Sequence, residues 1–353
     1  MRGAARTATA LFLAMWAALG ELPGGTVFAA VERTFRVNVI TPETDIMSQT
    51  VKFFGDRVTT LSGGRVKFHY FWAGSLVPIA NTFKGLRDGL TDLSTHALSY
   101  VSGEIADVAV LEVPFAWPLD ARNMKAFQDE VNRILDVIFW RNGQVLLFAN
   151  PAIMPNAISC RRGFLSREGD YKGKLIRTAG RWQGEAVKAW GARPVTIPLG
   201  DLYAALQRGT VDCTLLVYNL VESFRTYEVA RYITRVDHSI QYTVLAMNRE
   251  KWEQLSADEQ AMFRRAAVET WDYGVRLRDV RFREVLENLA RNGAEFCTPP
   301  VSEFRRLRRL AEGVWEQIRK EVSERGRQIM LIASKYREAA AERPAVGPNN
   351  PCP

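Results

Sequence analysis

The spacing of apolar residues along the chain switches between a two-residue period, typical of strands, and a helical period. Residues Thr34 to Ile40 alternate apolar and polar side chains and predict a strand. From Thr44 to Leu61 the apolar side chains recur on one helical face, and Gly63-Gly64 ends the helix. The next elements are a strand, a helix and a strand, at residues 65–72, 80–87 and 90–95. This order favours a largely parallel sheet.

The same alternation returns between Lys172 and Cys213. A strand predicted to end at Arg177 precedes a helical run to Trp190, and two further strands with a helix between them follow. The junction before the last strand, Leu206-x-x-Gly209-x-x-Asp212, repeats the earlier Leu86-x-x-Gly89-x-x-Asp92. Two βαβαβ runs with matching junctions favour two α/β lobes of similar build.

The remaining elements connect and brace these two lobes. A helix is predicted over residues 121–140, and strands at 145–149 and 157–160 lead from the first lobe to the second. Residues 240–246 carry the chain back, so at least two crossings predict a hinge. A capping box, Ser256-Ala257-Asp258-Glu259, starts a long helix that Asn292-Gly293 closes. We therefore predict an α/β fold of two lobes with hinge strands, a long bracing helix and a ligand cleft between the lobes.

The N-terminus has the pattern of a secretory signal peptide. Arg2 and Arg6 precede an apolar run, and Val27-Phe28-Ala29 fits a cleavage site. The predicted divisions are a signal peptide at 1–29, a first lobe at 30–154 and a second lobe at 155–242. Residues 243–343 return to the first lobe and form the C-terminal helices, and 344–353 form a disordered tail. We predict an exported, periplasmic protein.

Charge and cysteines refine this picture. The formal net charge is +8, dispersed along the chain without a Lys/Arg block interleaved with aromatics, so we expect no nucleic-acid partner. A basic exported protein is better suited to attracting anionic solutes. The four cysteines match no zinc or redox spacing. Cys160 with Cys213 is the favoured disulfide, and Cys352, in a proline-rich tail, is expected to stay unpaired.

Arg177 is the main candidate for ligand binding. It is predicted at the carboxyl end of a strand, where open α/β sheets bind ligands, and a guanidinium grips a carboxylate through two parallel hydrogen bonds. Other candidates follow predicted strands or open helices around the same cleft. They are Thr41, Glu43, His96, Tyr100, Asn156, Arg181, Trp182, Leu216, Tyr218 and Asn219. Each has a structural alternative, as a packing, capping or core residue.

The sequence shows no catalytic or cofactor motif. His69, His96 and His238 are scattered without metal-ligand spacing, and no Gly-x-Ser-x-Gly elbow, phosphate loop or dinucleotide fingerprint is present. We therefore predict no enzyme activity, no cofactor and no metal. Asp92 and Asp212 are interpreted as junction residues.

Several stretches resemble the substrate-binding subunits of TRAP transporters, the DctP-type extracytoplasmic solute-binding proteins. They include Phe83 to Asp92, Leu111 to Phe115, Tyr171 to Arg177 and Gly191 to Asp212. The resemblance runs from about Thr34 to about Lys335. It implies two hinged α/β lobes, a membrane permease as partner, and an arginine, here Arg177, that clamps a substrate carboxylate.

Two departures from the family pattern bear on the ligand. Cys213 replaces a usual glycine, and Leu215 and Leu216 stand where many members carry an asparagine or acid for substrate or metal. The metal-assisted keto-acid subgroup is therefore not favoured. An apolar wall beside the arginine suits a less polar carboxylate, unless the leucines are core residues.

The main hypothesis is a periplasmic receptor that captures an organic acid and delivers it to TRAP permease subunits. Two alternatives stay open: an exported two-lobed enzyme acting on a small acid, and a sensory receptor of the same fold. The sequence is compatible with a monomer or with a homodimer through the C-terminal helices.

Overall fold

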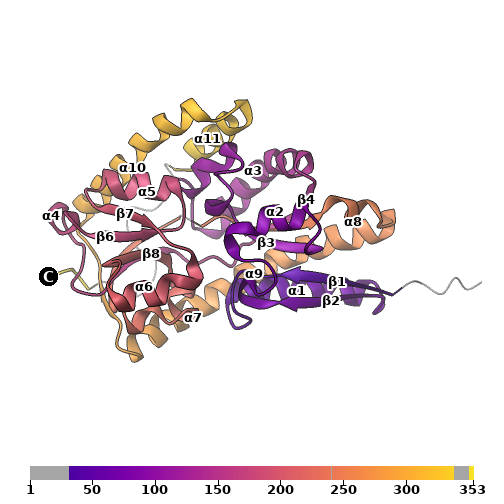
Figure 1. The fold of residues 1–353 in the computed structure, drawn as a ribbon, viewed down its shortest axis with the longest axis horizontal. Coiled ribbons are helices and arrows are strands. Elements are labelled where there is room, and N and C mark those ends of the chain that lie inside the picture. Colours follow the sequence, from indigo (N-terminus) through magenta and orange to yellow (C-terminus); the bar gives the residue numbers. More distant parts are fainter. Residues whose placement is uncertain (1–31, 240, 338–349) are drawn as a thin grey trace, which may run out of the picture. The chain divides into compact units, whose positions relative to one another are not determined.

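The computed structural model describes residues 32–239, 241–337 and 350–353 (Figure 1). The predicted signal peptide and residues 344–349 of the predicted tail lie outside this range. Residues Arg33–Pro353 form one compact unit that contains two β-sheets. The predicted α/β class with two sheets is confirmed.

The first sheet has five strands in the order β2-β1-β3-β10-β4. Their bounds are β1 Arg33–Asn38, β2 Val66–Phe71, β3 Leu93–Ala97, β4 Gln144–Ala149 and β10 Thr243–Asn248. The strands β1, β2 and β3 are mutually parallel, as the opening pattern predicts, whereas β10 runs antiparallel to both β3 and β4. The returning strand β10 is thus inserted into the middle of the sheet that the N-terminal residues begin.

Three main helices accompany the first sheet: α1 Ile46–Leu61, α2 Thr82–Arg87 and α3 Ala121–Arg141. Asp45 begins α1 as its N-cap, and its side chain accepts a hydrogen bond from the Met47 amide at 2.8 Å. Short 3₁₀ turns fill the connections, at Trp72–Gly74, Ile79–Asn81, Leu98–Tyr100 (η3) and Ala106–Glu112 (η4). We call these strands and helices, with α8 Arg249–Glu253, the first-sheet half.

The second sheet has six strands in the order β11-β9-β5-β8-β6-β7. Their bounds are β5 Asn156–Cys160, β6 Leu175–Thr178, β7 Arg193–Thr196, β8 Cys213–Val217, β9 Tyr232–His238 and β11 Glu295–Cys297. The predicted βαβαβ run corresponds to β6, β7 and β8, which are parallel to one another. Cys160 lies directly opposite Cys213 on the antiparallel pair β5 and β8, and the predicted disulfide joins them.

The helices of the second sheet are α4 Glu168–Tyr171, α5 Arg181–Ala189, α6 Leu202–Arg208 and α7 Tyr218–Ser223, with 3₁₀ turns at Leu199–Asp201 and Thr226–Glu228. Figure 1 shows α5 on one face of β6, β7 and β8 and α6 on the other. In the strand order, β7 lies on one side of β6 and β8 lies on the other. We call these elements, with strands β5–β9 and β11, the second-sheet half.

The chain passes between the two sheets from β4 to β5 and again from β9 to β10. The 35-residue helix α9, Ala257–Arg291, packs against α1 of the first-sheet half and α7 of the second. The predicted capping box is present, since Ser256 and Glu259 bond reciprocally. Gly274 allows the segment between β4 and β5 to pass close to α9, because a Cβ at position 274 would lie 2.7 Å from Cγ of Pro151. The helix therefore braces both halves.

Two further helices, α10 Val301–Glu321 and α11 Glu324–Arg337, complete the C-terminal part. The first packs against α5 and the second against α3 and η4. Within the described residues, no helix is both long and apolar enough to cross a membrane.

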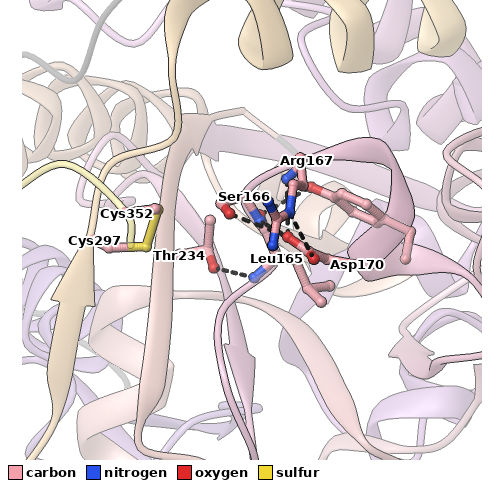
Figure 2. Close-up of a disulfide and its surroundings, with 8 residues drawn as sticks. Leu165, Ser166, Arg167, Asp170, Thr234, Cys297 and Cys352 are labelled. Carbon is pink, nitrogen blue, oxygen red and sulfur yellow. Dashed lines mark hydrogen bonds and ion pairs between the residues drawn. A yellow bond between two sulfur atoms is a disulfide. The ribbon is translucent and has the colours of Figure 1, made fainter.

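The end of the chain corrects two predictions. Cys352 is not a free thiol: it forms a disulfide with Cys297 at the end of β11, which Figure 2 shows. The backbone of Thr298 also donates to Asn350 and accepts from Cys352, so residues 350–353 are fixed to the second sheet. Sequence separation alone gave no reason to pair these two cysteines.

Strand β9, which pairs with β11 beside this disulfide, forms a hydrogen bond with the segment that follows β5. Figure 2 shows the hydroxyl of Thr234, on β9, accepting a hydrogen bond from the amide of Leu165 at 2.9 Å. The carboxylate of Asp170 accepts from the amides of Ser166 and Arg167 at 2.8 and 3.0 Å. These contacts order the loop that leads into β6.

Candidate functional site

The topology of the second sheet places a candidate site at the carboxyl end of β6. The connections of β6 and β8 run to opposite sides, and open α/β sheets bind ligands in the crevice outside the strand ends at such a switch point. Arg177 is the third residue of β6, which ends at Thr178. The structure therefore agrees with the predicted position of Arg177 at a strand end.

Arg177 is 1% exposed, although it carries a permanent charge. Its Nε donates to the carbonyl oxygen of Ile197 at 2.8 Å, and its Nη2 donates to the hydroxyl of Tyr100 at 2.7 Å. Within the described residues these bonds use two of the five guanidinium N–H groups, and no carboxylate pairs with it. A buried cation in this state can accept an anion as its partner.

Tyr100 brings the first-sheet half to this arginine. It is the last residue of η3, which follows β3 directly. The sequence placed Tyr100 past the third strand and facing Arg177, and the 2.7 Å hydrogen bond agrees with that placement. The two residues are 77 positions apart in the sequence, so tertiary folding alone joins them.

A second contact between the halves involves Asn219, on α7. Its Nδ2 donates to Oδ1 and Oδ2 of Asp45 at 3.3 and 3.1 Å, and Ser223 donates to the same carboxylate at 3.0 Å. Burial raises the pKa of Asp45, and the hydrogen bonds from Asn219, Met47 and Ser223 offset part of the rise.

A cavity of about 330 Å³ opens beside this contact. It is lined by Thr44, Asp45, Ile46, Asn219, Glu222, Ser223, Arg225 and Arg281. The lining includes carboxylates and guanidinium groups from α7, α9 and the start of α1. A polar compound of small size could enter here.

Several buried polar side-chain atoms have no hydrogen-bond partner within the described residues. They are the hydroxyl oxygen of Ser99, Oδ1 of Asn156 and Oδ1 of Asn219. Such atoms are uncommon in folded proteins, and a bound solute is one way to satisfy them. Asn156 opens β5, and its Nδ2 lies 3.4 Å from Nε2 of His238.

His96 is not placed as predicted. It lies inside β3 rather than beyond it, with no exposure to solvent. Its Nδ1 is 3.0 Å from the hydroxyl of Thr82, and its Nε2 is 3.0 Å from Oε1 of Gln144. Burial lowers the pKa of His96 to about 3, so the ring is neutral at ordinary pH. The prediction that His96 faces Arg177 is wrong.

Arg181 and Trp182 are the first two residues of α5, and each has a structural partner. Arg181 is largely exposed and forms a bidentate ion pair with Glu321, at 2.7 and 2.6 Å. Trp182 is 2% exposed and belongs to the main apolar core, with the Arg181 guanidinium over its ring at 4.3 Å. The structure brings neither side chain into contact with Arg177 through a hydrogen bond among the described residues.

The other candidates have structural partners. Tyr218 is buried and donates to Oδ1 of Asp237 at 2.6 Å. Leu216 lies in the middle of the second sheet opposite Ala157, as a core residue. Thr41 bonds to the hydroxyl of Ser48 at 2.7 Å, and Glu43 is exposed at the turn before α1.

Three acidic residues at these contacts were missed by the sequence analysis. Asp45 was detectable, because an Asp directly before an apolar helical run is a typical N-cap. Glu112 lies in an apolar loop and is fully buried, and Asp237 pairs with Arg235 inside the second sheet at 2.6 Å. No local pattern marks Glu112 or Asp237, because their surroundings come from distant segments.

The arrangement is suited to binding an anion. The buried groups supply a guanidinium, hydroxyls and amides from both halves. Among residues 32–239, 241–337 and 350–353, no three His, Cys, Asp or Glu side chains converge as a metal site would require.

Solved structures share this fold. A TRAP periplasmic solute-binding protein of Sulfitobacter sp., with bound β-D-galacturonate, matches with a TM-score of 0.78 over 87% of this chain and all of its own, at 19% identity. An extracytoplasmic solute receptor of Bordetella pertussis that binds pyroglutamic acid matches with a TM-score of 0.79 over 86% of this chain and 99% of its own, at 17% identity.

Curated relatives cover a similar span. The 2,3-diketo-L-gulonate-binding periplasmic protein YiaO of Escherichia coli is 23% identical over 277 residues, 75% of this chain and 81% of its own. The ectoine-binding periplasmic protein TeaA of Halomonas elongata is 25% identical over 263 residues, 73% of this chain and 76% of its own. The family model of the bacterial extracellular solute-binding proteins, family 7, matches residues 37–321. The chain therefore belongs to this DctP family of extracytoplasmic solute-binding proteins.

Proposed function

We propose that this protein captures an organic acid in the periplasm and delivers it to the membrane subunits of a TRAP-type transporter. In this proposal Arg177 binds the carboxylate of the solute. Tyr100 and Asn219 form the polar part of the site together with Asn156, and the protein acts as a receptor rather than an enzyme.

The state of Arg177 is the observation that carries the proposal. A charge held away from water costs several kcal/mol unless a partner of opposite charge compensates it. Within the described residues Arg177 has a carbonyl and a hydroxyl as partners but no carboxylate. A solute carboxylate would supply the missing charge and could use the remaining N–H groups in parallel.

The compounds named with the relatives support this ligand class. Galacturonate, pyroglutamate and diketogulonate each carry one carboxylate, and they are bound by proteins of the same fold or family. The rest of each compound differs, so the shared feature is the acid group. We infer that the carboxylate is recognised by Arg177 and that other side chains select the remainder.

The proposal also includes the division of the chain. We propose residues 30–154 and 155–242 as the two lobes, with 243–343 returning to the first, and closure of the lobes over the solute. The contacts Tyr100–Arg177 and Asp45–Asn219 join the two halves and would form as the lobes close. Export by residues 1–29 and docking on a permease complete the proposed route.

The test starts with a thermal-shift screen of carboxylic acids, including galacturonate and pyroglutamate, because a bound ligand raises the melting temperature by mass action. Calorimetry then compares wild-type protein with Arg177→Ala and Arg177→Lys. We expect Arg177→Ala to lose about 2–5 kcal/mol of binding free energy, since a buried carboxylate loses its charged partner. Arg177→Lys should recover only part, because lysine cannot form two parallel hydrogen bonds.

Arg181→Ala is the matched control. It removes an arginine only four positions away, whose side chain is exposed and paired with Glu321. Its affinity should stay within a factor of a few of wild type, because exposed ion pairs contribute about 0–1 kcal/mol. Equal losses in both alanine variants, or unchanged affinity in Arg177→Ala, would contradict the proposal.

A further inference from the structure

A second carboxyl group lies buried where the two halves meet. Glu112 is the last residue of η4, in the first-sheet half, and has no exposure to solvent. It lies against the start of α5, the helix that begins four residues after Arg177. The proposed function uses the arginine but gives Glu112 no role.

The position of Gly180, the N-cap of α5, shows how closely Glu112 approaches the start of this helix. A Cβ at position 180 would lie 2.3 Å from Oε2 of Glu112 and 2.3 Å from the carbonyl oxygen of Ser99. Only a glycine therefore allows η3 and η4 to approach the helix this closely. Ser99 is the neighbour of Tyr100, so the same approach brings the Tyr100 hydroxyl to Arg177.

The carboxyl group faces the N-terminus of α5 without a full complement of partners. Neither Oε1 nor Oε2 forms a hydrogen bond of good geometry within the described residues. Burial raises the pKa of Glu112 to about 8, and the nearby hydroxyl of Ser102 and the amides of Gln183 and Trp182 offset part of the rise. A side chain that prefers its neutral form is thus enclosed between the halves.

The charged groups around Glu112 are engaged elsewhere. On α5, Arg181 is paired with Glu321 at the end of α10, and Glu185 is half-buried one turn further on. On β6, Arg177 bonds to Tyr100 of η3. Among the described residues none of these cations forms an ion pair with Glu112, so burial dominates its protonation.

We propose that Glu112 is a positioning residue for the Arg177 site, a neutral carboxyl group that holds η3 and η4 against α5 and gives up its proton when they separate. This inference rests on the proposed function, because it makes solute capture and proton uptake one event. In water a glutamate has a pKa of about 4.3. The joined state therefore binds a proton that the separated state releases.

The direction in which pH changes the stability of the joined state follows from these two pKa values. The pKa in the joined state is raised, so the stabilisation is fully present below about 4.3 and is lost as the pH rises through about 8. Between these values the equilibrium constant for separation rises about tenfold per pH unit. Above about 8 it levels off.

Hydrogen exchange read by mass spectrometry tests this on the full chain without any ligand. Amide protection over residues 178–190, corrected for intrinsic base catalysis, is measured from pH 6 to pH 9 for wild type and Glu112→Gln. Wild-type protection should fall by up to about 100-fold between pH 6 and pH 8, whereas the neutral glutamine should keep a flat profile. Glu185→Gln, a control on the same helix, should follow wild type.

Parallel profiles in wild type and Glu112→Gln, or a flat wild-type profile, overturn the proposal. If Glu112→Gln fails to fold, the wild-type profile against Glu185→Gln still decides, since it must decline with pH. Galacturonate then serves as a probe in calorimetry with buffers of different ionisation enthalpy, where proton uptake near pH 7 should be larger in wild type than in Glu112→Gln, by up to about one proton. Absence of galacturonate binding would count against the proposed ligand class and leave the exchange result unaffected.

Discussion

Two buried arginines of the second sheet differ in how their charge is balanced. Arg235, on β9, donates to Oδ2 of Asp237 at 2.6 Å, and Tyr218 donates to Oδ1 of the same carboxylate at 2.6 Å. Arg177, on β6, reaches only a carbonyl and a hydroxyl within the described residues. Both side chains are 1% exposed.

The difference separates a structural charge from a binding charge. The Arg235 cluster completes its ion pair inside the fold, where Asp237 of the same strand supplies the carboxylate and Tyr218 of α7 supplies a hydroxyl. The Arg177 site draws its partners from both halves and still lacks an anion among the described residues. We interpret the first as part of the scaffold and the second as the part that recognises solute.

The largest expected effect comes from breaking the Arg235 cluster. Asp237→Asn keeps the shape and tolerates the positive φ of 32° at this position, but removes the carboxylate that pairs with Arg235. We expect the free energy of unfolding to fall by about 3–5 kcal/mol, because a buried guanidinium loses its carboxylate partner. Chemical denaturation measures the change.

The exposed pair of Arg231, directly before β9, and Glu295, on β11, provides the control for this variant. Glu295→Gln should change the free energy of unfolding by about 0–1 kcal/mol, since water compensates both groups. If both variants lowered the free energy of unfolding equally, burial would not make the Arg235 cluster more important for stability than an exposed ion pair.

A smaller effect, of opposite sign, is expected at Arg177. Replacing this arginine by methionine removes a buried charge that no carboxylate in the described chain compensates. We expect the free energy of unfolding to stay level or rise by about 1–2 kcal/mol, since apolar replacements of buried charges are often neutral or stabilising. Denaturation without added acid measures this, and a loss resembling that of Asp237→Asn would remove the contrast between the two arginines.

The two tyrosine hydroxyls extend the comparison to single hydrogen bonds. Tyr218→Phe removes a donor to Asp237 and should lower the free energy of unfolding by about 1–3 kcal/mol, because the carboxylate keeps one partner fewer. Tyr100→Phe should leave stability within about 1 kcal/mol and weaken binding of the acid found in the screen. Melting curves and calorimetry on both variants make the comparison, and the reverse pattern would exchange the roles of the two regions.

Much of the fold follows from local patterns. The capping box at Ser256, the helix stop at Asn292-Gly293 and the position of Arg177 near the end of β6 are all present in the structure. These features depend on residues within a few positions of one another, so short-range chemistry decides them. The Cys160–Cys213 pair also agrees with the prediction.

The third strand shows where local patterns fail. It was predicted at residues 90–95 but runs from Leu93 to Ala97, which places His96 inside the sheet. All five residues of this strand are buried, so no alternation marks its ends. Asp92 instead bonds to the amide of Arg36 at 2.8 Å, and this contact with β1 belongs to the turn before the strand.

Local sequence patterns were enough to predict the two alternating runs, the exposed and buried faces of the long helices, and the arginine at the end of β6. Tertiary structure alone decided that Tyr100 reaches Arg177, that Asn219 reaches Asp45, that Cys352 joins Cys297 and that Glu112 is enclosed beside Gly180. The reason is physical. Strand and helix periods are set by neighbouring residues, whereas the burial and charge balance of a side chain depend on segments brought together only when the chain folds.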